Sequence, residues 1–455
     1  MSVGSILNTA LRSMQATQLS IAVSSNNIAN AQTPGYSRQR LITRPAQGEG
    51  DGSTGTGIDV VRVESVRNQL IDTRLKQETA KKSQHETLSG ALSDIEVLFN
   101  ESNESGFLPV LTKFFNSFHA LSADPSSTIY REEIRTNAQS MADSFKNRGE
   151  SLRSIQSMTN AAIADDVARA NDLIAQIATV TVSIKEHGAE SSSNELHDQR
   201  SILVRELSKL MEVRELEAGT DYHLTTSSNR LLALNGTAMP LTTEPSDDSG
   251  LLIVRSGQAD ITNELGPGQI KANLELRDRY LPKYMAALDT LAYDIVTNVN
   301  AIHSAAYDLN AITGINFFTP PDSSEGAPRL MTLSEDVAGD PGKIAAATDA
   351  AGLNNLAAID MGNLLHNAVF TGGSVTDQYG NLVSTVGSDV LNAASSLRQH
   401  EALEFQLENR RSAISGVSID EETVQMLGFQ RAYEASARLV RTVDEMLQTL
   451  LAMGG

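Results

Sequence analysis

The amino-acid sequence predicts a mainly α-helical, elongated, rod-like protein of several domains that includes a smaller β-rich domain. Hydrophobic residues recur at helical spacing over most of the 455 residues, whereas residues 214–264 consist of short runs split by turn residues. Aromatic residues make up only 4% of the chain, which fits helix packing through aliphatic side chains better than a β-sandwich. Both ends carry a heptad pattern, so we expect the N- and C-terminal helices to pair as a coiled coil.

The N-terminal helix is predicted by residues that follow one another in alternating steps of four and three. This seam becomes polar toward its end, where Thr33 precedes a proline and Gly35 readily adopts a positive φ. The helix must therefore end in the turn from Thr33 to Tyr36. The seam comprises Leu7, Leu11, Met14, Gln18, Ile21, Ser25 and Ile28.

The next part of the chain is predicted to be helical after one strand at 58–66. Helical spacing covers 67–99, and a second helix ends before Asp124-Pro125. A very long helix is expected over about 130–187, with Gly149 as a candidate kink, and an amphipathic helix over 195–213.

The β-rich segment covers about 214–264, and Asn235-Gly236 within it is typical of a type I′ hairpin turn. A helix is expected over 269–306, followed by an irregular stretch rich in Pro, Gly and Ser to about residue 342. Helical spacing returns over 388–412.

The C-terminal helix repeats the heptad stepping of the N-terminal one. Ser418 followed by Glu421 is typical of a helix start. Each seam is too narrow for a globular core helix and needs a partner. The seam comprises Phe429, Ala432, Ser436, Leu439, Val443, Met446, Leu450 and Met453.

The charges of the two ends are opposite and favour attraction between them or between copies. Residues 1–45 contain four arginines and no acid, whereas residues 400–455 contain five arginines and nine acids. Uneven charge on solvated faces remains an alternative. We predict a terminal coiled-coil domain (1–66 and 401–455), a helical inner domain (67–213, 269–310 and 364–400) and a β-rich or irregular outer domain (214–268 and 311–363). The chain thus runs out and back, with both termini at one end.

Composition and motifs argue against catalysis and against several partner classes. The net charge of −20 disfavours nucleic acid and anionic membranes, and no apolar run is long enough to span a bilayer. Cysteine is absent, and the eight histidines have no metal-ligand spacing. No GxSxG or phosphate-loop motif occurs. We therefore expect no catalytic, cofactor-binding or metal-binding residues, and no cleaved signal peptide.

Two stretches at opposite ends carry a resemblance to a known family. "SSNNIANAQTPGYSRQR" (24–40) is similar to the N-terminal signature of bacterial flagellar rod, hook and hook-associated proteins, and "GVSIDEETVQMLGFQRAYEASARLVRTVDEMLQTLL" (416–451) resembles their C-terminal signature. The helix "NELHDQRSILVRELSKLMEVRE" and the segment ending in Phe317-Phe318 favour the hook-associated members at the hook–filament junction. Another axial subunit, a hook or distal rod protein, is the alternative; an enzyme with coiled-coil ends has no motif in its support.

The resemblance implies a structural, self-assembling subunit of the extracellular flagellum, exported through the flagellar type III apparatus. It implies as partners further copies of the chain, the hook protein, the second hook–filament junction protein and an export chaperone on the C-terminal helix. The short β-rich middle implies that a second outer domain of longer members is reduced or absent.

The candidate subunit contacts lie at the two ends. Asn26, Asn27 and Asn30 are either solvated amides at a frayed helix end or, since an amide both donates and accepts, contacts to a neighbouring helix. The heptad side chains are either an internal seam, which we favour, or a surface exposed before assembly. The full set is Leu7, Leu11, Met14, Ile21, Asn26, Asn27, Asn30, Thr33, Pro34, Gly35, Tyr36, Phe429, Leu439, Val443, Met446 and Leu450.

Overall fold

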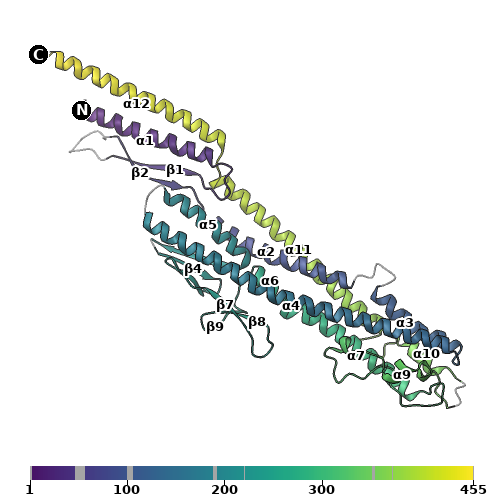
Figure 1. Ribbon diagram of the computed structural model, residues 1–455. Coiled ribbons are helices and arrows are strands. Elements are labelled where there is room, and N and C mark those ends of the chain that lie inside the picture. Colours follow the sequence, from purple (N-terminus) through teal and green to yellow (C-terminus); the bar gives the residue numbers. More distant parts are fainter. Residues whose placement is uncertain are drawn as a thin grey trace.

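The computed structural model describes residues 3–46, 57–99, 106–187, 192–219, 221–350, 354–370 and 372–453. The chain is an elongated, mainly helical rod with both termini at the same end (Figure 1). Long helices lie at both ends of the sequence, and small antiparallel sheets complete the fold. The predicted fold class is confirmed.

The terminal unit consists of α1 (Val3–Ala29), α12 (Ile419–Met453) and a hairpin of β1 (Gln39–Pro45) and β2 (Ile58–Ser65). The two helices lie side by side, with the hairpin beneath α1 (Figure 1). Ser13 Oγ and Ser436 Oγ are 3.1 Å apart between the helices. The sequence predicted β2 but not its partner β1.

The buried positions of α1 are small or polar rather than large and apolar. Ala10 and Ala16 are each 2% exposed, whereas Leu11 is 44% exposed. Because α1 packs against α12 and against the hairpin, small side chains let both neighbours approach closely. The buried set is Ala10, Ala16, Thr17, Val23, Ser24 and Asn27.

Long helices form the rod. α2 (Gln69–Leu98) packs along α11 (Val375–Ser415), and α4 (Thr128–His187) is one helix of 60 residues. Gly149, the candidate kink, lies within α4 without interrupting it. α11 begins well before residue 388, where the sequence predicted its start, because a capping box of Ser374 and Asp377 initiates it.

The far end of the rod holds a phenylalanine-rich core. α3 (Phe107–Ala123), α7 (Leu281–Ala305) and α10 (Leu356–Asn363) pack around the first half of α4. The rings of Phe317 and Phe318 lie edge to face at 4.7 Å, and both are fully buried. Short elements cover this core: α8 (Ala327–Leu330), α9 (Glu335–Gly339) and the 3₁₀ turn η2 (Pro341–Lys343).

A β module follows α5 (Ser192–Leu210) in the sequence and packs against the second half of α4 (Figure 1). One sheet has the order β3-β4-β5-β6 and the other the order β7-β8-β9. Asn235 and Gly236 have φ values of 51° and 94°, which confirms the predicted hairpin turn. The strands are β3 (Val213–Ala218), β4 (Asp221–Thr226), β5 (Leu231–Leu234), β6 (Thr237–Ala238), β7 (Leu241–Pro245), β8 (Leu252–Ser256) and β9 (Ala259–Asp260).

The two ends of the β module meet. Glu212 N donates to Pro267 O at 2.7 Å. The next residue, Gly268, has φ of 145°, and a Cβ there would lie 2.4 Å from Leu210 O, so only glycine fits. The chain then enters α6 (Gln269–Glu275), which continues through the π-helical turn η1 (Leu276–Tyr280) into α7.

The domain bounds inferred from the sequence stay predictions, and the bound between residues 400 and 401 falls within α11. Among the helices that the structure describes, none is apolar over a stretch long enough to cross a lipid bilayer.

Candidate assembly site

The side chain of Asn27 ties the end of α1 to the start of β1. Its Nδ2 donates to Gln39 O at 2.9 Å, and its Oδ1 accepts from Gln39 N at 2.9 Å and from the Tyr36 hydroxyl at 2.8 Å. Asn27 is 1% exposed. In the single chain it is therefore neither a solvated amide nor open to a neighbouring subunit, and it folds the turn back onto the helix.

The other two asparagines lie on the outer side of the same turn. Asn30 Nδ2 donates to Asn26 Oδ1 at 2.8 Å, and Thr33 Oγ1 donates to Asn30 Oδ1 at 3.1 Å. Asn26 and Asn30 are half-buried, while Thr33 and Pro34 are exposed. This outer side is the part of the signature that a neighbouring subunit can reach.

Gly35 and Arg38 hold the turn against the end of α11. Gly35 has φ of 79°, as the sequence predicted, and its carbonyl accepts from Arg411 Nη2 at 3.4 Å. Arg38 N donates to Ser415 O at 2.9 Å. The segment that leaves α1 and the segment that returns to α12 are thus joined at one point.

Tyr36 closes the inner side of this turn. Burial, with Asp198, Glu195 and Glu422 nearby, raises the pKa of the Tyr36 hydroxyl to about 12. The hydroxyl is therefore protonated at neutral pH and donates to Asn27 Oδ1.

The predicted attraction between the two ends occurs at Arg38. Its Nε lies 2.7 Å from Glu422 Oε1, and the side chain of Glu422 is 2% exposed. Glu421 is 3.7 Å from Arg38 Nη1 but is 66% exposed. Since both acids begin α12, the first turn of α12 is anchored to the basic N-terminal segment.

The predicted heptad side chains divide into a buried and an exposed group. Val443 is 2% exposed, whereas Leu439 and Met446 are 43% and 50% exposed. Leu11 is also exposed. Leu7, Met14, Ile21 and Phe429 are half-buried, and the side chain of Leu450 lies outside what the structure describes.

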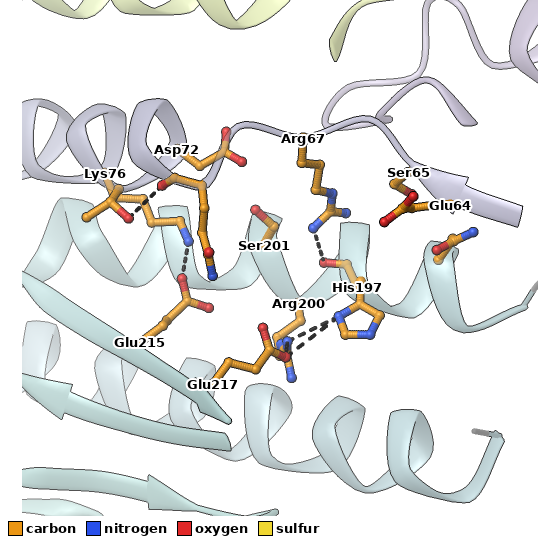
Figure 2. Close-up of a pocket in the computed structure, with 13 residues that line it drawn as sticks. Glu64, Ser65, Arg67, Asp72, Lys76, His197, Arg200, Ser201, Glu215 and Glu217 are labelled. Carbon is orange, nitrogen blue, oxygen red and sulfur yellow. Dashed lines mark hydrogen bonds and ion pairs between the residues drawn. The ribbon is translucent and has the colours of Figure 1, made fainter. Parts of the chain in front are cut away.

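A polar cavity of about 370 Å³ lies beside this site, between the β2–α2 connection, α2, α5 and β3 (Figure 2). Lys76 pairs with Glu215, and Arg200 pairs with Glu217. Burial, followed by the charge of Arg200, lowers the pKa of the neighbouring His197. The charges of these two pairs compensate one another within the wall of the cavity. Among the described residues, no three His, Asp or Glu side chains are placed to hold a metal ion.

The middle part and both ends of the chain match known families. Residues 92–318 match the family described as the flagellar hook-associated protein FlgK helical domain. Residues 7–36 match the flagella basal body rod protein family, and residues 410–453 match the C-terminal family of flagellar basal body rod FlgEFG proteins. The three matches follow one another along the chain.

Full-length relatives carry one name. The chain is 26% identical to flagellar hook-associated protein 1 of Bacillus subtilis, over 98% of this chain and 97% of the relative. It is 24% identical to flagellar hook-associated protein 1 of Escherichia coli, over 99% of this chain and 100% of the relative. That alignment extends over 546 positions, so the relative contains residues without a counterpart in the 455 residues here.

A solved structure shares the fold. The flagellar hook junction protein FlgK from Burkholderia pseudomallei superposes with a TM-score of 0.66 at 15% identity, over 75% of this chain and 100% of that chain. The ordered family matches and the full-length relatives show that the chain belongs to the FlgK family of flagellar hook-associated proteins and is a structural protein of the hook–filament junction.

Proposed function

We propose that the chain acts without catalysis and assembles with neighbouring axial subunits through its terminal unit. One observation carries the proposal: α12 leaves large apolar side chains uncovered along its length. Val424 is 70% exposed, Leu451 77% and Met453 82%. A pair of helices with such an uncovered apolar surface is marginal in water and gains stability when another chain covers it.

The contacting residues of this assembly are proposed to be the exposed members of the candidate set. On α1 and the turn they are Leu11, Thr33 and Pro34, and on α12 they are Leu439 and Met446. Asn27 and Val443 are buried and support the terminal unit from within. Neighbouring subunits related by rotation then use two different faces of the same unit, as closed rings require.

The proposed partners are further copies of this chain, the hook protein and the second hook–filament junction protein. Before assembly, an export chaperone is proposed to cover the apolar side of α12. The proposed route to the flagellum outside the cell is the flagellar type III apparatus, without a cleaved signal peptide. The apolar side chains exposed on α12 support this, because a free subunit with such a surface is prone to aggregate.

Deletion of the gene tests the junction role. The mutant is expected to build hooks without filaments and to release flagellin into the medium, seen by electron microscopy and by blotting of the supernatant. Normal filaments would contradict the proposal. Loss of a hook or distal rod subunit would instead remove the hook itself, which separates the alternative.

A further inference from the structure

One face of α5 points away from the β module and toward the terminal unit. Asn194, Asp198, Ile202 and Arg205 follow one another in steps of four, four and three, which places them along one side of the helix. We call these four residues the α5 platform. Each of them lies against a different part of the segments that lead to the terminal helices.

The first half of the platform contacts the hairpin. Asn194 Nδ2 donates to Val63 O in β2 at 3.1 Å. Asp198 Oδ2 accepts from Ser37 N at 3.4 Å, and Asp198 Oδ1 accepts from Arg67 Nη2. Ser37 comes just before β1, and Arg67 comes just after β2. A single carboxylate thus closes both ends of the hairpin.

The second half of the platform contacts the turn and the returning helix. A Cβ on Gly35 would lie 2.5 Å from Ile202 Cγ1, so the backbone of the turn rests directly on this side chain. Arg205 Nη2 lies 3.4 Å from Glu408 Oε2 in α11. The platform therefore reaches both the outgoing and the returning segment.

We infer that the α5 platform fixes the direction in which the terminal unit leaves the rod, with Asp198 as its central positioning residue. The inference deepens the proposed function, because that direction sets how terminal units of neighbouring subunits meet. This direction is a property of the single chain and can be measured in the purified monomer.

Burial strengthens the contacts of Asp198. Its side chain is 8% exposed and that of Arg67 is 26% exposed, so water screens their attraction less than at an open surface. A carboxylate that accepts from a guanidinium and from a backbone N–H makes charge-assisted bonds, which are stronger than neutral ones.

The β2–α2 connection is supported less on the side that faces the polar cavity. Arg67 and Ser65 face the polar cavity (Figure 2). The Nε atom of Arg67 and the Oγ atom of Ser65 are buried and have no hydrogen-bond partner among the described residues. Loss of the Asp198 contact therefore leaves Arg67 with its 3.5 Å bond to His197 O as its remaining link to α5.

The absence of cysteine makes the inference directly measurable, because two introduced cysteines are the only sites for spin labels. Gln176→Cys on α4 and Ala435→Cys on α12 lie at exposed positions of the rod and of the terminal unit. Electron-electron double resonance between the labels reports how the unit is directed. We expect one narrow distance distribution in the purified chain and a wider or shifted one when Asp198→Ala is added.

Glu206→Ala is the matched control. Glu206 lies on the same helix, is exposed, and pairs only with Lys209 among the described residues. This control should leave the distribution unchanged. Arg67→Ala should widen it as Asp198→Ala does, and the double variant should add little to either, because both changes remove the same contact between Arg67 and Asp198.

An unchanged distribution in Asp198→Ala, or equal widening in Glu206→Ala, would overturn the inference. Should Asp198→Ala fail to fold, Asp198→Asn keeps the shape of the side chain and removes its charge, and the same two outcomes decide. The result is independent of the junction role, which the deletion strain tests separately.

Discussion

Arg38 Nε lies 2.7 Å from Glu422 Oε1, which joins the segment leaving α1 to the first turn of α12. Ser418, the residue before α12, also contributes, because Glu421 N donates to its Oγ at 3.4 Å. The two ends of the chain thus meet through an ion pair in which Glu422 is almost fully buried. Because Glu421 next to it is exposed, the buried and the exposed contact to Arg38 can be tested separately.

Replacing the buried acid should loosen α12. Glu422→Ala leaves the guanidinium of Arg38 partly buried without this partner, and we expect a loss of about 1–3 kcal/mol in the docking of α12. Hydrogen exchange of the first turns of α12 measures it. The control is Glu421→Ala, which removes a 66% exposed acid and should cost less than about 1 kcal/mol. Equal exchange in both variants would show that the buried pair does not hold the helix.

The three asparagines should separate into two classes. Asn27→Ala removes the partners of Gln39 N, Gln39 O and the Tyr36 hydroxyl, so we expect a loss of about 1–3 kcal/mol from unpaired buried groups. Asn26→Ala removes one half-buried bond and should change the free energy of unfolding by less than about 0.5 kcal/mol. If Asn26 contacts a neighbouring subunit, its variant assembles poorly although the monomer is stable. Comparable unfolding midpoints for the two variants would refute the division.

Charges introduced into α12 should act at different stages. Val443→Asp places a carboxylate at a position that is 2% exposed, so it should disrupt the pairing of α1 and α12 in the monomer. Leu439→Asp changes a side chain that is 43% exposed, and the monomer should keep its helix content by circular dichroism while assembly is lost. Normal motility and filament length in the Leu439→Asp strain would exclude a subunit contact there.

The far end of the rod should lose stability in mild acid because of His303. His303 is 1% exposed; its Nδ1 lies 2.7 Å from Ile315 O, and its Nε2 accepts from Ala345 N at 2.9 Å. Burial lowers its pKa to about 4, against about 6.5 for an unfolded histidine. The neutral ring thus fits the site, with the Nδ1 proton directed to Ile315 O.

Between these two pKa values only the unfolded chain binds the proton. The contribution of His303 to the free energy of unfolding is therefore complete above about pH 6.5 and is lost as the pH falls toward 4, by about 3 kcal/mol. Urea unfolding across this range measures the slope. His303→Gln should be less stable at neutral pH and show a smaller slope, whereas His187→Gln, at an exposed position, should retain the full slope. A parent slope equal to that of His303→Gln would refute the assignment.

Local signals predicted much of the fold. Asn235-Gly236 specified its turn because both residues tolerate positive φ. The positive φ of Gly35 in the turn after α1 was also predicted, although the helix ends at Ala29, before Thr33 is reached. Opposite charge at the two ends predicted their contact, which the structure realises between Arg38 and Glu422.

Features that depend on tertiary packing escaped prediction. The start of α11 was missed because Gly380 and Gly387 weaken the helical pattern, while Tyr379 and Val386 pack into the core and stabilise the helix. The heptad pattern of α1 indicated that the helix has a partner but not which side of the helix faces it. The predicted seam was drawn through large apolar residues, whereas the buried side is occupied by small residues such as Ala10 and Ala16. The contact of Asp198 with Ser37 spans 161 residues of sequence, and no local pattern points to it.

The closed neck of the β module, where Glu212 N bonds Pro267 O, has a practical consequence. Since the module leaves and rejoins the helical body at one place, its loops form a side branch whose length does not alter the main shaft. Exposed tips such as 247–250 are therefore suitable sites for grafting short foreign peptides, which would be carried on the outside of the shaft while its helices keep their register.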